Sequence, residues 1–165
     1  MTAQINENLR AYLAGYFERG GYFAIFLEED TESPKLADGV TSIIGAGLYI
    51  RVRDQDPVVP KLLHENFAGR LKQGQMSTWQ AWNLAAAQLL EAIQPFLKTG
   101  KRKAEIKLLL DFHEYLKSTY RSPVEGSSTW KHRRLFSASE QKEIRLFCLA
   151  EQELKKKFRG KREAR

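Results

Sequence analysis

The sequence predicts an α+β fold: a four-stranded antiparallel sheet built in the order αββαββα, with extra helices at the C-terminal end. Three observations predict it: a helical apolar stripe near the N-terminus, a strand that alternates apolar and basic residues, and a hairpin signal followed by further helical stripes. The chain has 165 residues, of which 42% are hydrophobic, and no internal repeat, so one core is expected rather than a disordered chain.

The N-terminal segment predicts a helix that packs on two sides. Its large residues recur at helical spacing and are expected to face the core: Leu9, Tyr12, Leu13, Tyr16 and Phe17. A second stripe is small, with Ala11, Ala14 and Gly15 followed by Glu18, and small residues let another backbone approach closely. Gly20 and Gly21 then end the helix.

Two strands are predicted next. The first covers residues 22–27 and runs into an acidic stretch, and a loop is expected over residues 33–39. The second strand has an apolar face made of Leu48, Ile50 and Val52. Its opposite face carries Tyr49, Arg51 and Arg53. This alternation predicts one face in the core and one basic face in solvent.

The remaining elements follow from caps and turns. Asp56 is expected to cap a helix that ends near Phe67, and a hairpin around Gly74 is expected to join residues 69–75 to residues 77–82. Asn83 is expected to cap a helix ending near residue 97, and another helix covers residues 101–120. A polar linker over residues 122–129 precedes a last helix, with Ser139 as its cap.

Positive charge is concentrated at the C-terminal end. The net charge is +7, and residues 131–165 hold 12 basic and 5 acidic residues, whereas residues 1–60 hold 5 and 9. This asymmetry suggests a polyanionic partner, nucleic acid before an anionic membrane surface, with a solubilising tail as the alternative. The tail residues concerned are Lys131, Arg133, Arg134, Lys155, Lys156, Lys157, Arg159, Lys161 and Arg162.

The cysteine count and the hydropathy indicate the cellular compartment. The single cysteine, Cys148, excludes an intramolecular disulfide framework, and it is expected to be a small core residue. No apolar run reaches the length of a membrane span, and the N-terminus lacks a signal-peptide pattern. An intracellular protein is expected, in the cytoplasm or nucleoid or in an organelle, with no membrane partner. His64, His113 and His132 lack zinc-ligand spacing.

Residues 13–21, with the sequence LAGYFERGG, resemble a degenerate LAGLIDADG motif, the signature of a family of homing endonucleases. A second passage supports the resemblance, because AIQPFLK at residues 92–98 precedes the basic cluster KRKA at residues 101–104, as in the family. The resemblance covers about residues 8–120. It implies a family-like domain over residues 1–121, extended by residues 122–165, and the length suits the single-motif, homodimeric branch.

The resemblance implies a dimer axis, a metal and a DNA surface. Two motif helices would meet at Ala11, Ala14, Gly15 and Glu18, and an acid at the helix end would bind Mg²⁺ for phosphodiester cleavage. The sequence departs from the pattern there, because Gly20 stands where that acid belongs. Glu18 and Asp54 are the remaining catalytic candidates, and no metal ligand or cofactor is expected unless cleavage survives.

The family's sheet lies in the major groove of DNA, which assigns candidate contacts to the basic face. The candidates on the predicted sheet are Tyr49, Arg51, Arg53, Arg70 and Lys72. Contacts with the phosphate backbone of the DNA are expected from Lys98, Lys101, Arg102 and Lys103. The acidic residues of the first strand would repel phosphates and so do not fit a DNA-binding surface. Two other partners therefore stay open: RNA whose bases stack on Tyr22, Phe26 and Tyr49, or another protein. Trp79 and Trp82 are expected in the core or on a sheet face.

The leading hypothesis is therefore a non-cleaving, homing-endonuclease-like homodimer that binds nucleic acid, double-stranded DNA first. Three alternatives remain open. One is an active Mg²⁺-dependent endonuclease with a relocated ligand, Glu18 or Asp54. The second is an RNA-binding splicing cofactor of the maturase type, and the third is a protein-interaction adaptor that has no affinity for nucleic acid.

Overall fold

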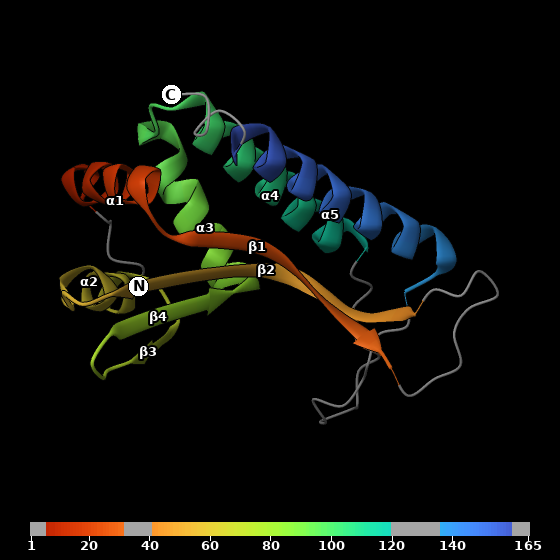
Figure 1. Cartoon of the computed structure of the whole chain (residues 1–165), viewed down its shortest axis with the longest axis horizontal. Helices are drawn as coiled ribbons and strands as arrows, with labels where there is room; N and C mark the ends of the chain where they lie inside the picture. The colour runs from red at the N-terminus through yellow and green to blue at the C-terminus, as the bar shows by residue number, and fades with distance from the viewer. Residues whose placement is uncertain (1–5, 32–40, 120–135, 160–165) are drawn as a thin grey trace. The chain divides into compact units, whose positions relative to one another are not determined.

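The computed structural model describes residues 6–31, 41–119 and 136–159. The loop expected over residues 33–39, the linker over residues 122–129, His132, the cluster at residues 131–134 and the end of the basic tail lie outside them. The described elements run α1, β1, β2, α2, β3, β4, α3, the short 3-10 helix η1, α4 and α5 (Figure 1). The predicted αββαββα order with extra C-terminal helices is confirmed.

The four strands form one sheet in the order β1-β2-β4-β3. They span Tyr22–Asp30 (β1), Ser42–Asp54 (β2), Arg70–Lys72 (β3) and Ser77–Trp82 (β4). β4 pairs antiparallel with both β2 and β3, which confirms the predicted hairpin. β1 and β2 are both longer than the sequence predicts. In β2 the extension toward the start of the strand contains the buried residues Ile43 and Ile44.

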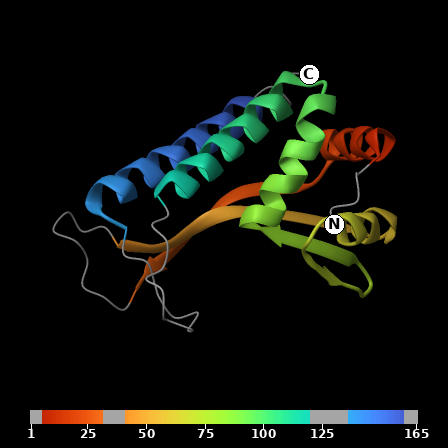
Figure 2. The same ribbon diagram turned by 180° about the vertical axis from the view of Figure 1, so that it is seen from behind.

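The chain divides into two compact units, each made of two stretches of sequence. The first unit contains residues up to 24 together with residues 48–110. In it α1 (Glu7–Arg19) packs against α3 (Asn83–Ile93) and η1 (Gln94–Phe96). Figure 2 shows α3 rising from the end of β4. α2 (Val58–Asn66) packs on β3 and β4.

α1 buries fewer of its large residues than expected. Leu13, Ala14 and Phe17 are fully buried, and Asn6 caps the helix through its side chain. The expected core position Tyr12 is instead 51% exposed. The buried strip of α1 is therefore narrower than the sequence predicts, and it is limited to Leu13, Ala14 and Phe17.

Of the two side-chain caps expected at α3 (Asn83–Ile93) and α2, one differs from expectation. The Asn83 side chain does not cap α3; its Oδ1 accepts a hydrogen bond from the backbone N–H of Leu48 at 3.2 Å. Asn83 has a positive φ of 46°, a conformation that asparagine tolerates better than most residues. Asp56 does act near the start of α2, where its Oδ1 accepts from the Val58 N–H at 3.0 Å.

The second unit contains residues 25–47 and residues from 111 onward. The C-terminal half of α4 (Gly100–Thr119) and α5 (Ala138–Arg159) run side by side in both views (Figures 1 and 2). Phe147 of α5 contacts Phe112 and Tyr115 of α4, with ring centroids 5.2 and 5.6 Å apart. Burial raises the pKa of the Cys148 thiol on α5 to about 11, so it is neutral near pH 7.

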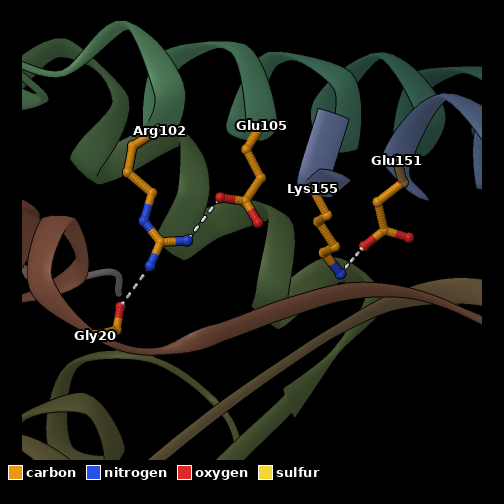
Figure 3. Close-up of polar contacts among 5 residues, drawn as sticks. All are labelled: Gly20, Arg102, Glu105, Glu151 and Lys155. Carbon is orange, nitrogen blue, oxygen red and sulfur yellow. Dashed lines mark hydrogen bonds and ion pairs between the residues drawn. The ribbon is translucent and has the colours of Figure 1, made fainter. Parts of the chain in front are cut away.

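α5 begins with a capping box two residues earlier than predicted. Ser137, rather than Ser139, is the cap, because its Oγ accepts from the Glu140 N–H at 3.2 Å. The Glu140 carboxylate reaches back to the Ser137 N–H at 2.8 Å, which completes the box. Glu151 of the same helix pairs with Lys155 at 2.5 Å (Figure 3).

Three polar side chains of α5 bond to the backbone of β1, β2 and the residue before β2. Gln141 accepts from the Ile43 N–H at 3.1 Å, and Glu151 accepts from the Ile25 N–H at 3.3 Å. Arg145 donates to the Thr41 carbonyl at 2.6 Å. These side chains satisfy backbone groups of the strand segments, which would otherwise need another hydrogen-bond partner. Among the described residues, no helix is long and apolar enough to cross a membrane.

Candidate nucleic-acid interface

β2 separates an apolar face from a basic one, as the sequence predicts. Leu48, Ile50 and Val52 are at most 1% exposed, while Arg51 and Arg53 point to solvent. Side chains of a strand alternate between the two faces of its sheet, so Tyr49 lies on the same side as the two arginines. We call this side of the first unit's sheet the outer face.

The strand register aligns the basic residues of the outer face into two rows. In the first basic row, Gln80 of β4 lies between Arg51 of β2 and Arg70 of β3. In the second basic row, Thr78 lies between Arg53 and Lys72 in the same way. All four cationic residues are exposed. The structure thus brings together the sheet residues that the sequence nominated separately, and each row has a polar side chain at its centre.

A row of aromatic side chains continues the outer face beyond the first basic row. Tyr22, Tyr49 and Trp82 form this aromatic row: the Tyr22 and Tyr49 ring centroids are 6.2 Å apart, and those of Tyr49 and Trp82 are 5.5 Å apart. The Gln80 side chain donates to the Tyr49 hydroxyl at 2.7 Å, and the Arg51 guanidinium lies 5.3 Å from the centre of the Tyr22 ring.

Thr78 and Gln80 were not identified as candidate contacts from the sequence. The sequence also did not predict which of the two tryptophans, Trp79 or Trp82, would be exposed. Trp79 is fully buried, whereas Trp82 is 42% exposed. The signal was present in β4, because Ser77, Trp79 and Ala81 are buried and alternate with Thr78, Gln80 and Trp82. Reading that alternation would have placed Gln80 and Trp82 on the outer face.

The basic cluster after η1 does not act as one surface. Lys98 and Lys103 are exposed, and Lys101 is partly exposed. Arg102 is directed inward, where its guanidinium donates to Glu105 at 2.6 Å and to the Gly20 carbonyl at 3.1 Å (Figure 3). It also lies 5.1 Å from the centre of the Phe23 ring. The expected contact of Arg102 with a phosphate backbone would therefore compete with the bonds that its guanidinium makes to Glu105 and to the Gly20 carbonyl.

Glu18, a tentative catalytic residue, serves as a backbone acceptor. Its Oε1 accepts from the Lys98 N–H and from the Thr99 N–H at 2.8 Å, just before α4 begins. These two hydrogen bonds hold the pKa of the Glu18 carboxyl below its ordinary value. Glu18 thus fastens the end of α1 to the start of α4.

Asp54, the second tentative catalytic residue, also has both oxygens engaged. One accepts from the Tyr16 hydroxyl at 2.9 Å, and the other accepts from the Asp56 N–H at 3.1 Å. Burial, followed by the hydrogen bond and the charge of Asp54, raises the pKa of Tyr16 above its ordinary value. Tyr16 therefore remains a proton donor to Asp54 throughout the physiological range.

The residues at the end of α1 do not fit a divalent cation. A hard cation needs oxygen ligands, and the backbone carbonyl of Gly20 is directed to the positively charged Arg102 instead. Within the described residues, no group of three or more His, Cys, Asp or Glu side chains could hold a metal ion.

The residues expected at a dimer axis divide between the core and the surface. Ala11 and Gly15 are exposed, and with Tyr12 and Arg19 they line a shallow groove of about 620 Å³ along α1. A Cβ atom added at Gly15 would meet nothing within 4 Å. Ala14 is fully buried in the chain itself, so it cannot lie on that open face as expected.

Solved structures that are similar to this chain include LAGLIDADG homing endonucleases. The homing endonuclease I-CvuI in complex with its target is 16% identical over 90% of this chain and 82% of its own, with a TM-score of 0.60. The archaeal intron-encoded homing endonuclease I-Vdi141I, complexed with DNA, is 12% identical over 90% and 86%, with a TM-score of 0.61. I-SmaMI bound to cleaved DNA is 13% identical, and this chain spans 42% of its length.

No protein-family model matches the sequence, and no curated protein matches it. At these low identities the solved structures establish the architecture alone. The chain has the LAGLIDADG homing-endonuclease fold, with its four-stranded antiparallel sheet, as the motif at residues 13–21 predicted.

Proposed function

We propose that this chain is a homing-endonuclease-like protein that binds double-stranded DNA through the outer face as a homodimer and does not cleave it. The observation that carries the proposal is the pair of basic rows. Four exposed cations from two different strands are aligned by register, Arg51 with Arg70 and Arg53 with Lys72. Such an array suits the phosphates that line a DNA groove, and arginine can also read guanine edges.

The solved neighbours support DNA as the polymer. I-CvuI and I-Vdi141I share this chain's fold and were each solved in complex with DNA. Polar side chains at the centre of each basic row add hydrogen-bonding groups between the cations, from Gln80 and Thr78. Base edges in the major groove present donors and acceptors that such groups can meet.

A binding titration tests the surface. Fluorescence anisotropy with a mixed-sequence duplex at several salt concentrations should give an affinity that falls steeply as salt rises. Replacing Arg51 and Arg53 together by Ala should weaken binding at least tenfold and make the slope of log affinity against log salt shallower by about 2, because two phosphate contacts are lost.

The matched control removes two other exposed lysines, Lys61 of α2 and Lys142 of α5. It makes the same change in net charge, so a loss confined to the Arg51 and Arg53 variant assigns the contacts to the outer face. Equal losses in both variants would mean that net charge alone drives binding. An unchanged titration for the Arg51 and Arg53 variant would overturn the proposed surface.

Loss of cleavage follows from the occupied oxygens at the end of α1. Gly20 offers no carboxylate, and its carbonyl bonds to Arg102. Glu18 holds two backbone N–H groups, and Asp54 holds Tyr16 and Asp56. Supercoiled plasmid incubated with saturating protein and Mg²⁺ should therefore stay intact. Nicking that requires Mg²⁺ and disappears in Glu18→Gln or Asp54→Asn would establish the active endonuclease instead.

The homodimer rests on the open face of α1. The exposed Ala11 and Gly15 leave the helix backbone accessible to a second copy, and Tyr12 beside them is half exposed. Gly15→Leu should give a folded monomer on a sizing column, since Gly15 is exposed and a Cβ added there meets nothing within 4 Å. Gln88→Leu, at an exposed position on α3, is the control. A dimer that survives Gly15→Leu would place the interface elsewhere.

A further inference from the structure

The aromatic row has chemistry that phosphate binding does not use. Tyr22 and Trp82 are 46% and 42% exposed, and Tyr49 lies between them. Large aromatic side chains seldom gather on the open face of a sheet unless something covers them, because each adds apolar area to the solvent-exposed surface. Paired bases cannot cover them by stacking, since the faces of paired bases are already in contact with neighbouring pairs.

We infer that the aromatic row stacks an unpaired nucleobase, so that the preferred ligand is a polynucleotide with at least one unpaired nucleotide. This inference deepens the proposed function and rests on it for the phosphate contacts. Every base has a π-face, and stacking on an aromatic side chain stabilises binding by about 1–3 kcal/mol per base.

The geometry pre-organises the row for this role. The hydrogen bond from Gln80 to the Tyr49 hydroxyl, 2.7 Å long, fixes the central ring, and Arg51 lies over the ring of Tyr22. Rings that are already held lose little side-chain freedom when a base stacks on them. The partly exposed indole of Trp82 adds the largest π-surface of the row.

The neighbouring charges select a nucleotide over other flat, apolar ligands. Arg51 belongs to the first basic row and also contacts the aromatic row, so one side chain joins the two surfaces. Residues two apart on a strand are separated by about 7 Å, which is the scale of one nucleotide. A base on Tyr49 and Trp82 therefore places its own phosphate near Arg51, whereas an uncharged aromatic ligand would leave that cation unused.

The test compares three probes of related sequence: a fully paired DNA duplex, the same duplex with three unpaired nucleotides at its centre, and an RNA hairpin that carries those nucleotides in its loop. Wild-type protein should bind the interrupted duplex at least about fivefold more tightly than the paired one. Binding should also quench the fluorescence of Trp82, identified by its absence in Trp82→Phe.

Trp82→Ala should abolish the preference for the interrupted duplex over the paired one, while Trp82→Phe should retain most of that preference. Tyr22→Ser provides a second variant at the other end of the row, and circular dichroism checks that each variant folds. Tight binding of the RNA loop alone would identify RNA as the source of the unpaired base; tight binding of both interrupted probes would show that either polymer serves.

Two results separate this inference from the proposed function. If the paired and interrupted duplexes bind equally, with binding dependent on Arg51 and Arg53 and insensitive to Trp82→Ala, the stacking site is overturned and duplex binding stands. If the paired duplex does not bind but the interrupted probes do, in a Trp82-dependent manner, duplex binding is overturned and the stacking site stands.

Discussion

Two arginines of the first unit, Arg51 and Arg102, each lie over one of two consecutive aromatic residues, yet they do different work. Arg51 is 5.3 Å from the centre of the Tyr22 ring and points to solvent on the outer face. Arg102 is 5.1 Å from the centre of the Phe23 ring, and its side chain is only 14% exposed. Tyr22 and Phe23 face opposite sides of β1, so the two guanidiniums occupy opposite environments.

The difference teaches that the surroundings of a cation, rather than its residue type, decide whether it is available to a ligand. Arg102 is neutralised by Glu105 at 2.6 Å and bonded to the Gly20 carbonyl, so its donors hold the chain together. Arg51 has polar and cationic neighbours in its row and keeps its charge toward solvent. One arginine therefore bonds within the fold, and the other keeps its charge open to solvent, where a ligand could reach it.

The largest effect is expected from removing Arg102. Arg102→Met should lower the free energy of unfolding by about 3 kcal/mol, because the buried carboxylate of Glu105 loses its partner. Urea denaturation followed by circular dichroism measures this. The double variant Arg102→Met, Glu105→Leu should recover much of the loss, since no charge is then left unpaired. A single variant as stable as wild type would contradict the structural role assigned to Arg102.

An intermediate effect, on binding alone, is expected at the far side of the two basic rows. Replacing Arg70 and Lys72 together by Ala should reduce duplex affinity several-fold at about 0.15 M salt and make the salt slope shallower by about 2, since two phosphate contacts are lost. The unfolding free energy should change by no more than about 0.5 kcal/mol, because both side chains are exposed. If stability falls and affinity does not, these residues belong with Arg102.

The smallest effect is expected at Glu18, and it depends on pH. Because the folded-state pKa of Glu18 lies below its unfolded value, the carboxylate stabilises the fold above the unfolded pKa, and this contribution is lost as pH falls through the folded pKa. Glu18→Gln should therefore be less stable than wild type by about 0.5 kcal/mol at pH 7, a small value because the group is exposed.

The Glu18→Gln difference should shrink toward zero as the pH falls through the folded-state pKa of Glu18, which lies below the ordinary value, because wild-type Glu18 then becomes protonated as well. Thermal melts of both proteins across pH 3 to 7 measure the convergence. A gap that is constant over this range would show that the charge of Glu18 does not stabilise the two backbone N–H groups.

The fold was predictable where local pattern and tertiary packing agree. The alternation of Leu48, Ile50 and Val52 with basic residues gave β2 its correct faces, and the glycine at position 74 marked the hairpin. Asn83 was mispredicted because its side chain accepts from Leu48, 35 residues away, and no local pattern signals a bond of that range. Local propensity made a cap plausible, and a tertiary contact determined the outcome.

For the same reason, the sequence predicted which strand residues of the candidate site are exposed but not how they align across the sheet. Exposed residues of a strand follow from the period of two, so Arg51 and Arg53 could be nominated from the sequence, but their alignment with Arg70 and Lys72 depends on register across β4. Arg102 lies in a run of cations that looks like a phosphate-binding cluster. Only its neighbours in space, Glu105 and the Gly20 carbonyl, distinguish it from Lys98 and Lys103.

The polar side chains that α5 directs to the strand backbone affect how the protein behaves at high concentration. A strand amide that donates to a carboxylate or an amide oxygen is unavailable to a strand of another chain, and Glu151 and Gln141 occupy two such amides, at Ile25 and Ile43. Both residues lie in apolar, β-rich segments of the kind that assemble by intermolecular strand addition. By holding these two amides, α5 removes two groups through which a strand of another chain could add to these segments.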